Sequence, residues 1–381
     1  MTLYLDNAAS SHPKPESVYL TVDEVLRTVG ANPGRASHAL ALKAGQLIIQ
    51  TRQALAKLLS IPDPHRIIFT SNATEAINLG LKGLLNSGDH VITSSLEHNS
   101  VIRPLRALEK KGVDLTIVSA DSQSHLAPRS IEKAIQKNTR IIILTHASNV
   151  TGGILPIEEV AALAHKHGLL FMVDAAQTVG VLPISIDELK LDLLAASGHK
   201  GLMGPQGTGF LFIGSNVSLR PLIEGGTGSQ SELEIQPDFL PDQMESGTLN
   251  TPGLAGLGAG VEFILQKSVE AIRRKELSLS RMLQDGLKEN KKIRIYGHGQ
   301  AEEGTSTLSF NISNMNPQLV ASILDTAYDM AVRPGLHCAA LAHRTLGTFP
   351  EGTVRVSPGF FNTENEIDSF LKAIKRISQK V

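Results

Sequence analysis

Lys200 lies in a stretch whose residue types are suited to covalent chemistry. An apolar run at residues 191–196 ends on Ser197, Gly198, His199 and Lys200, and several glycines follow. In open α/β sheets, ligands bind outside the carboxyl ends of the strands. A lysine at such a strand end, beside serine and histidine, could form an imine with a carbonyl compound while its neighbours hold an anionic group.

A carboxylate follows the preceding apolar run. Residues 169–173 are long enough for a buried parallel strand that ends at Asp174, and the 26 positions from there to Lys200 leave room for a crossover connection. Pyridoxal phosphate fits this pair, because its aldehyde takes a lysine, its pyridine nitrogen takes a buried carboxylate and its phosphate takes N–H groups and hydroxyls. The alternative interpretation is a solvated surface lysine and an aspartate that caps a helix.

Polar residues follow two earlier predicted strands as well. Residues 65–70 lead through a short turn into a helix, whose free amide groups could bind an anion together with the Thr74 hydroxyl. A capping role for the residues of that turn is compatible with anion binding. Residues 90–93 lead to His98, which is either a satisfied loop histidine or a group that stacks on an aldehyde cofactor and moves protons.

Composition bounds the class of protein. The chain has 381 residues, of which 41% are hydrophobic, with a formal net charge of -1. This is typical of a globular α/β protein, and no charge excess suggests nucleic acid or an acidic membrane surface as a partner. No apolar run approaches the roughly 20 residues of a membrane span, and we expect a cytoplasmic protein with no metal site. The one cysteine, Cys338, excludes an internal disulfide.

Strands alternate with helices along most of the chain. This order predicts an α/β large domain with a mostly parallel, doubly wound sheet at residues 16–255. A smaller α+β domain is expected from residues 1–15 and 256–381, with a long linking helix at about 253–287.

Taken together, these segments resemble the cysteine desulfurase family, a group of class-V aminotransferases of fold-type I that use pyridoxal phosphate. The resemblance covers essentially the whole chain. Its markers are LDNAAS near the start, TSNATEAIN at 70–78, LEHNS at 96–100, SNVTG at 148–152, VDAAQ at 173–177, SGHKGLMGPQGTG at 197–209, ESGTLNT at 245–251, RPGLHCA at 333–339 and RVSPGFFNT at 355–363.

The resemblance implies a cofactor role for each matching position. Lys200 would bind pyridoxal phosphate covalently and later move the Cα proton of the substrate. Asp174 would keep the pyridine nitrogen protonated, Gln177 would hydrogen-bond the ring hydroxyl, and His98 would stack on the ring and relay a proton. The phosphate would be held by Ala73, Thr74, Ser197 and His199, with Thr248 reaching in from the partner subunit of a homodimer.

The resemblance also implies a substrate site for L-cysteine or selenocysteine. Arg355 lies in an apolar strand, where a lone charge is costly, and would clamp the substrate's carboxylate with help from Asn149. A structural ion pair is the alternative for Arg355. Ala9 belongs to a run of small residues that allow a ligand to approach closely, and Arg35 resembles a residue lent across the dimer.

Cys338 is implied to be the sulfur-accepting nucleophile. It would attack the sulfur of the bound cysteine, leaving alanine and a persulfide that could pass to a sulfur-acceptor protein, for example in iron–sulfur cluster assembly. Arg333 and His337 could favour the thiolate that this attack needs. An inert small hydrophobe is the alternative for this cysteine.

Three positions depart from the family pattern. Leu336 stands where the related branch has a first histidine, Phe361 where it has tyrosine, and Gly34 where it has histidine. Two other functions therefore remain open: a selenocysteine lyase or another β-lyase or aminotransferase with the same cofactor, and a non-catalytic sulfur carrier or scaffold.

Overall fold

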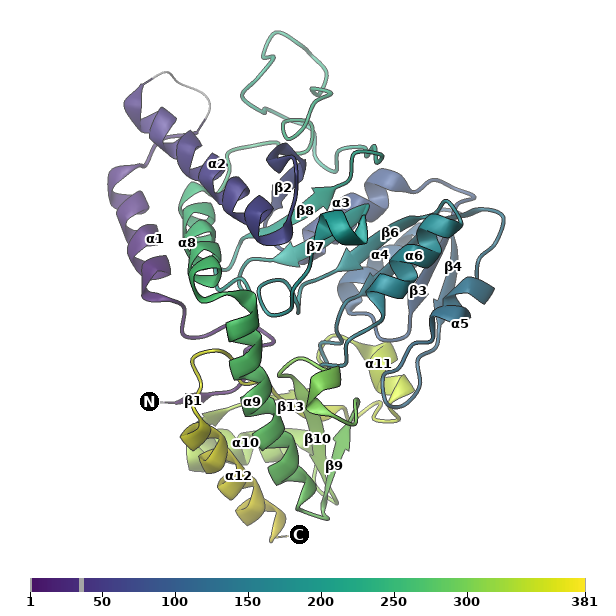
Figure 1. Ribbon diagram of the computed structural model, residues 1–381, viewed down its shortest axis with the longest axis vertical. Coiled ribbons are helices and arrows are strands. Elements are labelled where there is room, and N and C mark those ends of the chain that lie inside the picture. Colours follow the sequence, from purple (N-terminus) through teal and green to yellow (C-terminus); the bar gives the residue numbers. More distant parts are fainter. Residues whose placement is uncertain (1, 34–37, 381) are drawn as a thin grey trace.

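The computed structural model describes residues 2–33 and 38–380. A seven-stranded sheet forms the centre of its larger part, in the order β2-β8-β7-β6-β5-β3-β4 (Figure 1). The strands are β2 (Ile67–Thr70), β3 (His90–Ser94), β4 (Asp114–Val118), β5 (Thr139–Thr145), β6 (Leu170–Asp174), β7 (Leu193–Ser197) and β8 (Gly209–Ile213). The α/β class and the mostly parallel sheet are thus confirmed.

One strand of this sheet runs against the others. β8 pairs antiparallel with both β7 and β2. Only residues 198–208 join β7 to β8, and a return of this length has no room for the crossover helix that a parallel strand needs.

Helices cover both faces of the sheet because its strands are buried on both sides. Within β5, Ile142 and Leu144 join the apolar cluster on one face, whereas Ile141 and Ile143 join the cluster on the other, as alternating side chains of a strand must. The first face is covered by α2 (Ala39–Leu59), α6 (Ile157–Lys166) and α8 (Thr251–Lys267), and the second by α3 (Ala73–Leu84) and α4 (Asn99–Glu109). The remaining helices of this part are α1 (Glu16–Thr28), which packs on α8, and the short α5 (Pro128–Lys133) and α7 (Ile186–Leu189).

A four-stranded antiparallel sheet, in the order β12-β13-β10-β9, forms the smaller part. Its strands are β9 (Ile293–Tyr296), β10 (Leu308–Ile312), β12 (Arg333–Gly335) and β13 (Thr353–Val356), and its helices are α9 (Val269–Lys288), α10 (Pro317–Tyr328), α11 (Ala340–Thr345) and α12 (Glu364–Ser378). β1 (Leu3–Tyr4) pairs in parallel with β11 (Met330–Ala331), so the first residues of the chain join this part (Figure 1). The RPGLHCA motif at 333–339 begins with β12. The domain limits remain a prediction. No helix among the described residues is long and apolar enough to cross a membrane.

The prediction of one continuous linking helix at about 253–287 is wrong, because the structure divides this segment into α8 and α9. Ser268 interrupts the helix with φ 67° and ψ 146°, and its side chain accepts a hydrogen bond from the backbone N–H of Ala271. The serine thus caps α9 in a backbone conformation that is otherwise almost confined to glycine. Apolar periodicity continues across this break, so the sequence pattern predicted one helix.

The break predicts opposite effects for two small substitutions at Ser268. Ser268→Gly relieves the strained backbone and loses only a weak cap, whereas Ser268→Ala loses the cap and keeps the strain. We expect the glycine variant to exceed the alanine variant in stability by about 1 to 2 kcal/mol. Denaturant unfolding of both variants measures the difference, and an alanine variant of equal or greater stability would contradict it.

Candidate active site

The carboxyl ends of the central strands meet around one cavity of about 310 Å³. β3 and β5 are neighbours in the sheet, and the chain continues from β3 to β4 on one side and from β5 to β6 on the other. The cavity lies beside this switch point, which is where doubly wound sheets bind ligands. Eleven of the residues singled out from the sequence line it: Ala9, Ala73, Thr74, His98, Asn149, Asp174, Gln177, Ser197, His199, Lys200 and Arg355. The structure therefore gathers residues from both ends of the chain at one edge of the sheet.

Lys200 lies in the turn at residues 198–202, which follows β7. Gly198 allows this turn, because a Cβ there would overlap the hydroxyl of Thr208, the residue before β8. Burial lowers the pKa of Lys200 to about 8, with Arg355 and Arg333 lowering it further and Asp174 and Cys338 opposing the shift. An amine with this pKa is partly neutral near pH 7 and can attack a carbonyl.

Asp174 is the last residue of β6, and its side chain is buried. One carboxylate oxygen accepts a hydrogen bond from the backbone N–H of Ala176 at 3.0 Å. Burial raises the pKa of Asp174, opposed by that hydrogen bond and by the charge of Lys200. A cationic ring nitrogen placed in the cavity would supply the partner that this carboxylate needs.

Donors for an anion gather where α3 begins. The backbone N–H of Ala73 donates to the Ser197 hydroxyl at 3.1 Å, and Thr74 shares a hydrogen bond with Ser100 at 2.7 Å. His199 holds a buried Nδ1 atom with no hydrogen-bond partner. A helix start with hydroxyls and an imidazole in one cavity is suited to a phosphate group.

His98 is held in one orientation at the start of α4. Its Nδ1 atom accepts the backbone N–H of Ser100 at 3.0 Å, so the neutral ring carries its proton on Nε2. Burial lowers the pKa of His98 to about 4, and the charges of Lys200 and Arg333 add to this effect. The ring is therefore uncharged at neutral pH.

Arg355 lies on β13 with 1% of its surface exposed. It donates to the carboxylate of Asp6 at 2.6 Å and to the backbone oxygen of Asn149 at 3.0 Å, and its Nε atom has no partner. The structural ion pair with Asp6 is thus present. The neighbouring strand places Arg333 directly opposite Arg355, and two like charges in this position favour an anion between them.

Cys338 is exposed and does not line the cavity, but its neighbours Arg333 and His337 do. The Arg333 guanidinium lies 3.8 Å from the sulfur. Both His337 and Cys338 have positive φ angles, of 48° and 57°. The thiol therefore lies on a tight turn at the rim of the cavity.

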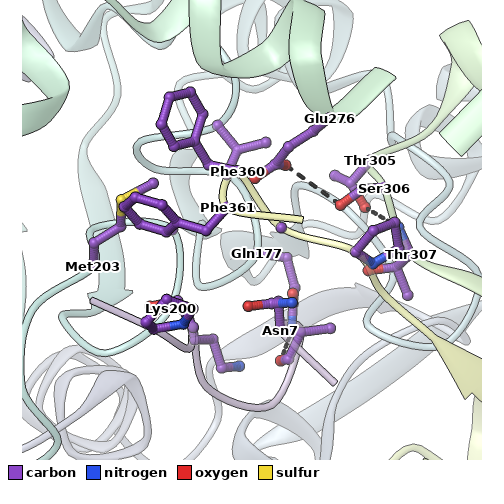
Figure 2. A pocket seen from close by; sticks show the side chains of 17 residues that line it. Asn7, Gln177, Lys200, Met203, Glu276, Thr305, Ser306, Thr307, Phe360 and Phe361 are labelled. Carbon is purple, nitrogen blue, oxygen red and sulfur yellow. Dashed lines mark hydrogen bonds between the residues drawn. The ribbon is translucent and has the colours of Figure 1, made fainter. Parts of the chain in front are cut away.

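A second, smaller pocket of about 40 Å³ adjoins the cavity and shares Gln177 and Lys200 with it (Figure 2). The Glu276 carboxylate in this pocket accepts a hydrogen bond from Ser306 at 3.3 Å, and burial raises its pKa to about 7. Phe361 also lies here, 5.9 Å from Phe263 between ring centres. The replacement of tyrosine by phenylalanine at 361 thus affects the side pocket and not the larger cavity.

One further expected position, Thr248, does not line this cavity. Thr248 lines a different surface pocket, where its hydroxyl lies 3.2 Å from the side-chain nitrogen of Asn32. Arg35 lies outside the described residues, as does Gly34.

Sequence reasoning missed Glu97, which precedes His98. The residue has no exposed surface, and its carboxylate accepts hydrogen bonds from the Ser94 hydroxyl at 2.6 Å and the backbone N–H of Thr145 at 2.9 Å. It therefore ties the end of β3 to the end of β5. A charged residue between Leu96 and His98 was the available signal, but alone it did not distinguish a buried carboxylate from an exposed one.

Comparisons with known proteins agree with this geometry. The family model described as Aminotransferase class-V matches residues 3–370. A probable cysteine desulfurase from Methanothermobacter thermautotrophicus is 36% identical, covering 99% of this chain and 94% of that protein. A probable cysteine desulfurase from Pyrococcus abyssi is 35% identical, covering 98% of this chain and 94% of that protein.

Solved structures give the same result. A cysteine desulfurase from Thermococcus onnurineus NA1 superposes with a TM-score of 0.94 at 32% identity, covering 100% of this chain and 95% of that one. The Escherichia coli cysteine desulfurase CsdA gives 0.89 at 27% identity, covering 100% of this chain and 95% of that one. The chain belongs to the class-V aminotransferase family. The relatives and solved structures given above are named cysteine desulfurases or probable cysteine desulfurases, in agreement with the sequence motifs.

Glu97 predicts a pH-dependent effect of the isosteric change Glu97→Gln. Burial raises the pKa of Glu97 from 4.5 to about 8, so the folded protein keeps a proton that the unfolded chain loses above pH 4.5. This group's contribution to stability therefore falls as the pH rises from 4.5 to about 8. Glutamine does not titrate, so the melting temperature of the variant relative to wild type should rise across this range. A difference that stays constant between the two ends of the range would refute the assignment.

Proposed function

We propose that this protein is a pyridoxal-phosphate-dependent cysteine desulfurase that converts L-cysteine to L-alanine and takes the sulfur onto Cys338 as a persulfide. The observation that carries the proposal is the position of the buried Lys200 amine. It lies beside Asp174 in a cavity whose rim holds the only thiol of the chain. The family and the names of its relatives support the same reaction.

The residues of the cavity fit the cofactor. His199 offers an unpaired buried nitrogen near the start of α3, and Asp174 offers a buried carboxylate whose raised pKa a cationic ring would lower. Lys200 offers an amine of reduced pKa. When bound, pyridoxal phosphate would supply the aldehyde that takes an amine and the ring that withdraws electrons from Cα.

Different residues of the cavity would contact different parts of that cofactor. Lys200 would hold it and then move the proton at Cα, and Asp174 would keep the ring nitrogen protonated. His98 would cover the ring with an imidazole kept neutral by burial, its proton on Nε2. Gln177, whose amide already donates to the Ala8 backbone oxygen at 3.0 Å, would direct its oxygen to the ring hydroxyl. The phosphate would take donors from Ala73, Thr74, Ser197 and His199.

The charged side of the cavity would select an amino acid. Arg355 would exchange part of its contact with Asp6 for the substrate's carboxylate, and the unpaired oxygen of Asn149 is free to accept a hydrogen bond nearby. Ala9 presents only a methyl group and would leave room for the ligand.

The sulfur transfer balances without an added oxidant. The bond between Cβ and sulfur of the substrate breaks, and a bond forms between that sulfur and the sulfur of Cys338. The thiol proton is released, Cβ gains a proton, and the products are L-alanine and the persulfide of Cys338. A thiol reductant or a sulfur-acceptor protein, such as one in iron–sulfur cluster assembly, would then regenerate the thiol.

A homodimer would complete the site. Apolar side chains are exposed on α1 and α2, among them Leu20, Leu42 and Ile49, and Ile235 in the 214–250 connection is 75% exposed. Ile49 and residues 227–229 line one surface pocket, so these exposed segments are neighbours. Thr248 lines a surface pocket and not the cavity of its own chain, which suits a residue that contacts the cofactor of the partner subunit. Arg35 would act across the same interface.

The nucleophile assignment predicts the behaviour of Cys338→Ala. Because the chain has no other cysteine, no thiol can replace it. With L-cysteine as substrate and dithiothreitol present, alanine formation should fall by about 100-fold or more, while the yellow colour of the purified protein persists. Alanine is measured by chromatography.

Other outcomes would identify other functions. Undiminished release of alanine in Cys338→Ala would favour a lyase or aminotransferase that does not use this thiol. A colourless wild-type protein that releases no alanine would favour a carrier or scaffold. Lys200→Ala is the matched control, because it should lose both the covalently bound colour and the activity and keep the thiol.

A further inference from the structure

We propose that His337 is a positioning residue that fixes the Cys338 turn through a closed circuit of buried hydrogen bonds, with the imidazole proton on Nε2. The inference extends the proposed function, because it concerns how the turn that bears the proposed nucleophile is held.

The circuit links the turn to both parts of the molecule. The side-chain nitrogen of Asn149 donates to the backbone oxygen of His337 at 2.7 Å. The His337 Nε2 atom lies 3.1 Å from the Thr353 hydroxyl on β13, which donates to the Ser309 hydroxyl at 3.0 Å. Ser309 donates to the backbone oxygen of Val150 at 2.7 Å, and Val150 follows Asn149, so the path closes on itself.

The direction of each proton follows from this arrangement. The Ser309 proton goes to a carbonyl oxygen, which can only accept, so Ser309 must accept from Thr353. The Thr353 proton is then used, and Nε2 of His337 must donate. Nδ1 is left as a bare acceptor, and it is the buried atom of this ring that has no partner. An unpaired acceptor costs less than an unpaired N–H group, so this tautomer is the favourable one.

Nearby positive charges also keep His337 neutral, with its single proton on Nε2. A second proton on His337 would place an unpaired donor in a buried site near Arg355 and Arg333. Burial, with those two charges and His343, lowers the pKa of His337 to about 2. The circuit therefore keeps its direction at every pH at which the protein is expected to work.

The turn that the circuit holds has an unfavourable backbone conformation. His337 and Cys338 both adopt positive φ angles, which residues with side chains adopt only where contacts impose them. Asn149 holds the backbone of the first, and the backbone N–H of Asn99 donates to the carbonyl of Cys338 at 2.8 Å. The ring supplies the third point of attachment, and it leads to β13, the strand that carries Arg355. The thiol and the carboxylate-binding guanidinium are thereby fixed relative to one another.

The test compares variants that break the circuit with variants that conserve it. His337→Ala removes the ring N–H donor, and Thr353→Val removes the hydroxyl that accepts from it and donates to Ser309. His337→Gln keeps an N–H donor, and Thr353→Ser keeps the hydroxyl. With the holoenzyme and L-cysteine, we expect the first pair to lower kcat for alanine about 10- to 100-fold with KM within about threefold, because the thiol is misplaced while carboxylate binding persists. The second pair should stay within about threefold of wild type. His343→Gln is the control, since that ring lies 5.4 Å from His337 and bonds Thr348 instead.

Hydrogen exchange of the peptide that contains residues 336–339 gives a readout that does not depend on activity. Exchange should be faster in His337→Ala and Thr353→Val and unchanged in the conservative pair. Wild-type exchange and kcat in His337→Ala would overturn the proposal, as would a His337→Gln variant as impaired as His337→Ala. If Cys338→Ala remained active while these exchange differences held, the nucleophile assignment would fail and the positioning role would stand.

Discussion

The site depends on three cationic side chains that face one cavity, and one of them, Arg355, is fully buried. Lys200, Arg333 and Arg355 line a single cavity, and the carboxylates among them are those of Asp6 and Asp174. Arg355 can remain there because Asp6 pairs with it, and Lys200 because part of its population is neutral. An anionic ligand would neutralise the positive charge that remains. The charges that line the cavity thus favour an anionic group such as a phosphate or a carboxylate.

Burial, reinforced by nearby positive charges, keeps the surrounding histidines neutral. His98, His199 and His337 all have lowered pKa values, with burial as the main cause and nearby cations as the second. Each therefore acts through a lone pair or a single N–H group. This explains why hydrogen-bond geometry, such as the Ser100 contact of His98, matters more here than protonation.

Motifs at strand ends predicted most of the cavity, because the carboxyl ends of parallel strands must meet at one edge. Lys200, Asp174 and His98 were found in this way. Glu97 was missed because a single charged residue in a predicted loop does not show whether its side chain is buried. The antiparallel course of β8 and the break at Ser268 depend on connection length and one backbone conformation, which apolar periodicity does not encode. The circuit through His337, Thr353 and Ser309 joins residues far apart in the chain, and such pairings cannot be read from local patterns.

The pairing of β1 with β11, and of Asp6 with Arg355, has a consequence for synthesis. A ribosome makes the first of these residues long before the second, so the early segment waits without its partner while the central sheet is assembled. Contacts of such large sequence separation form late and slowly. The side of the cavity that Arg355 forms is therefore added only after all seven strands of the central sheet have been synthesised.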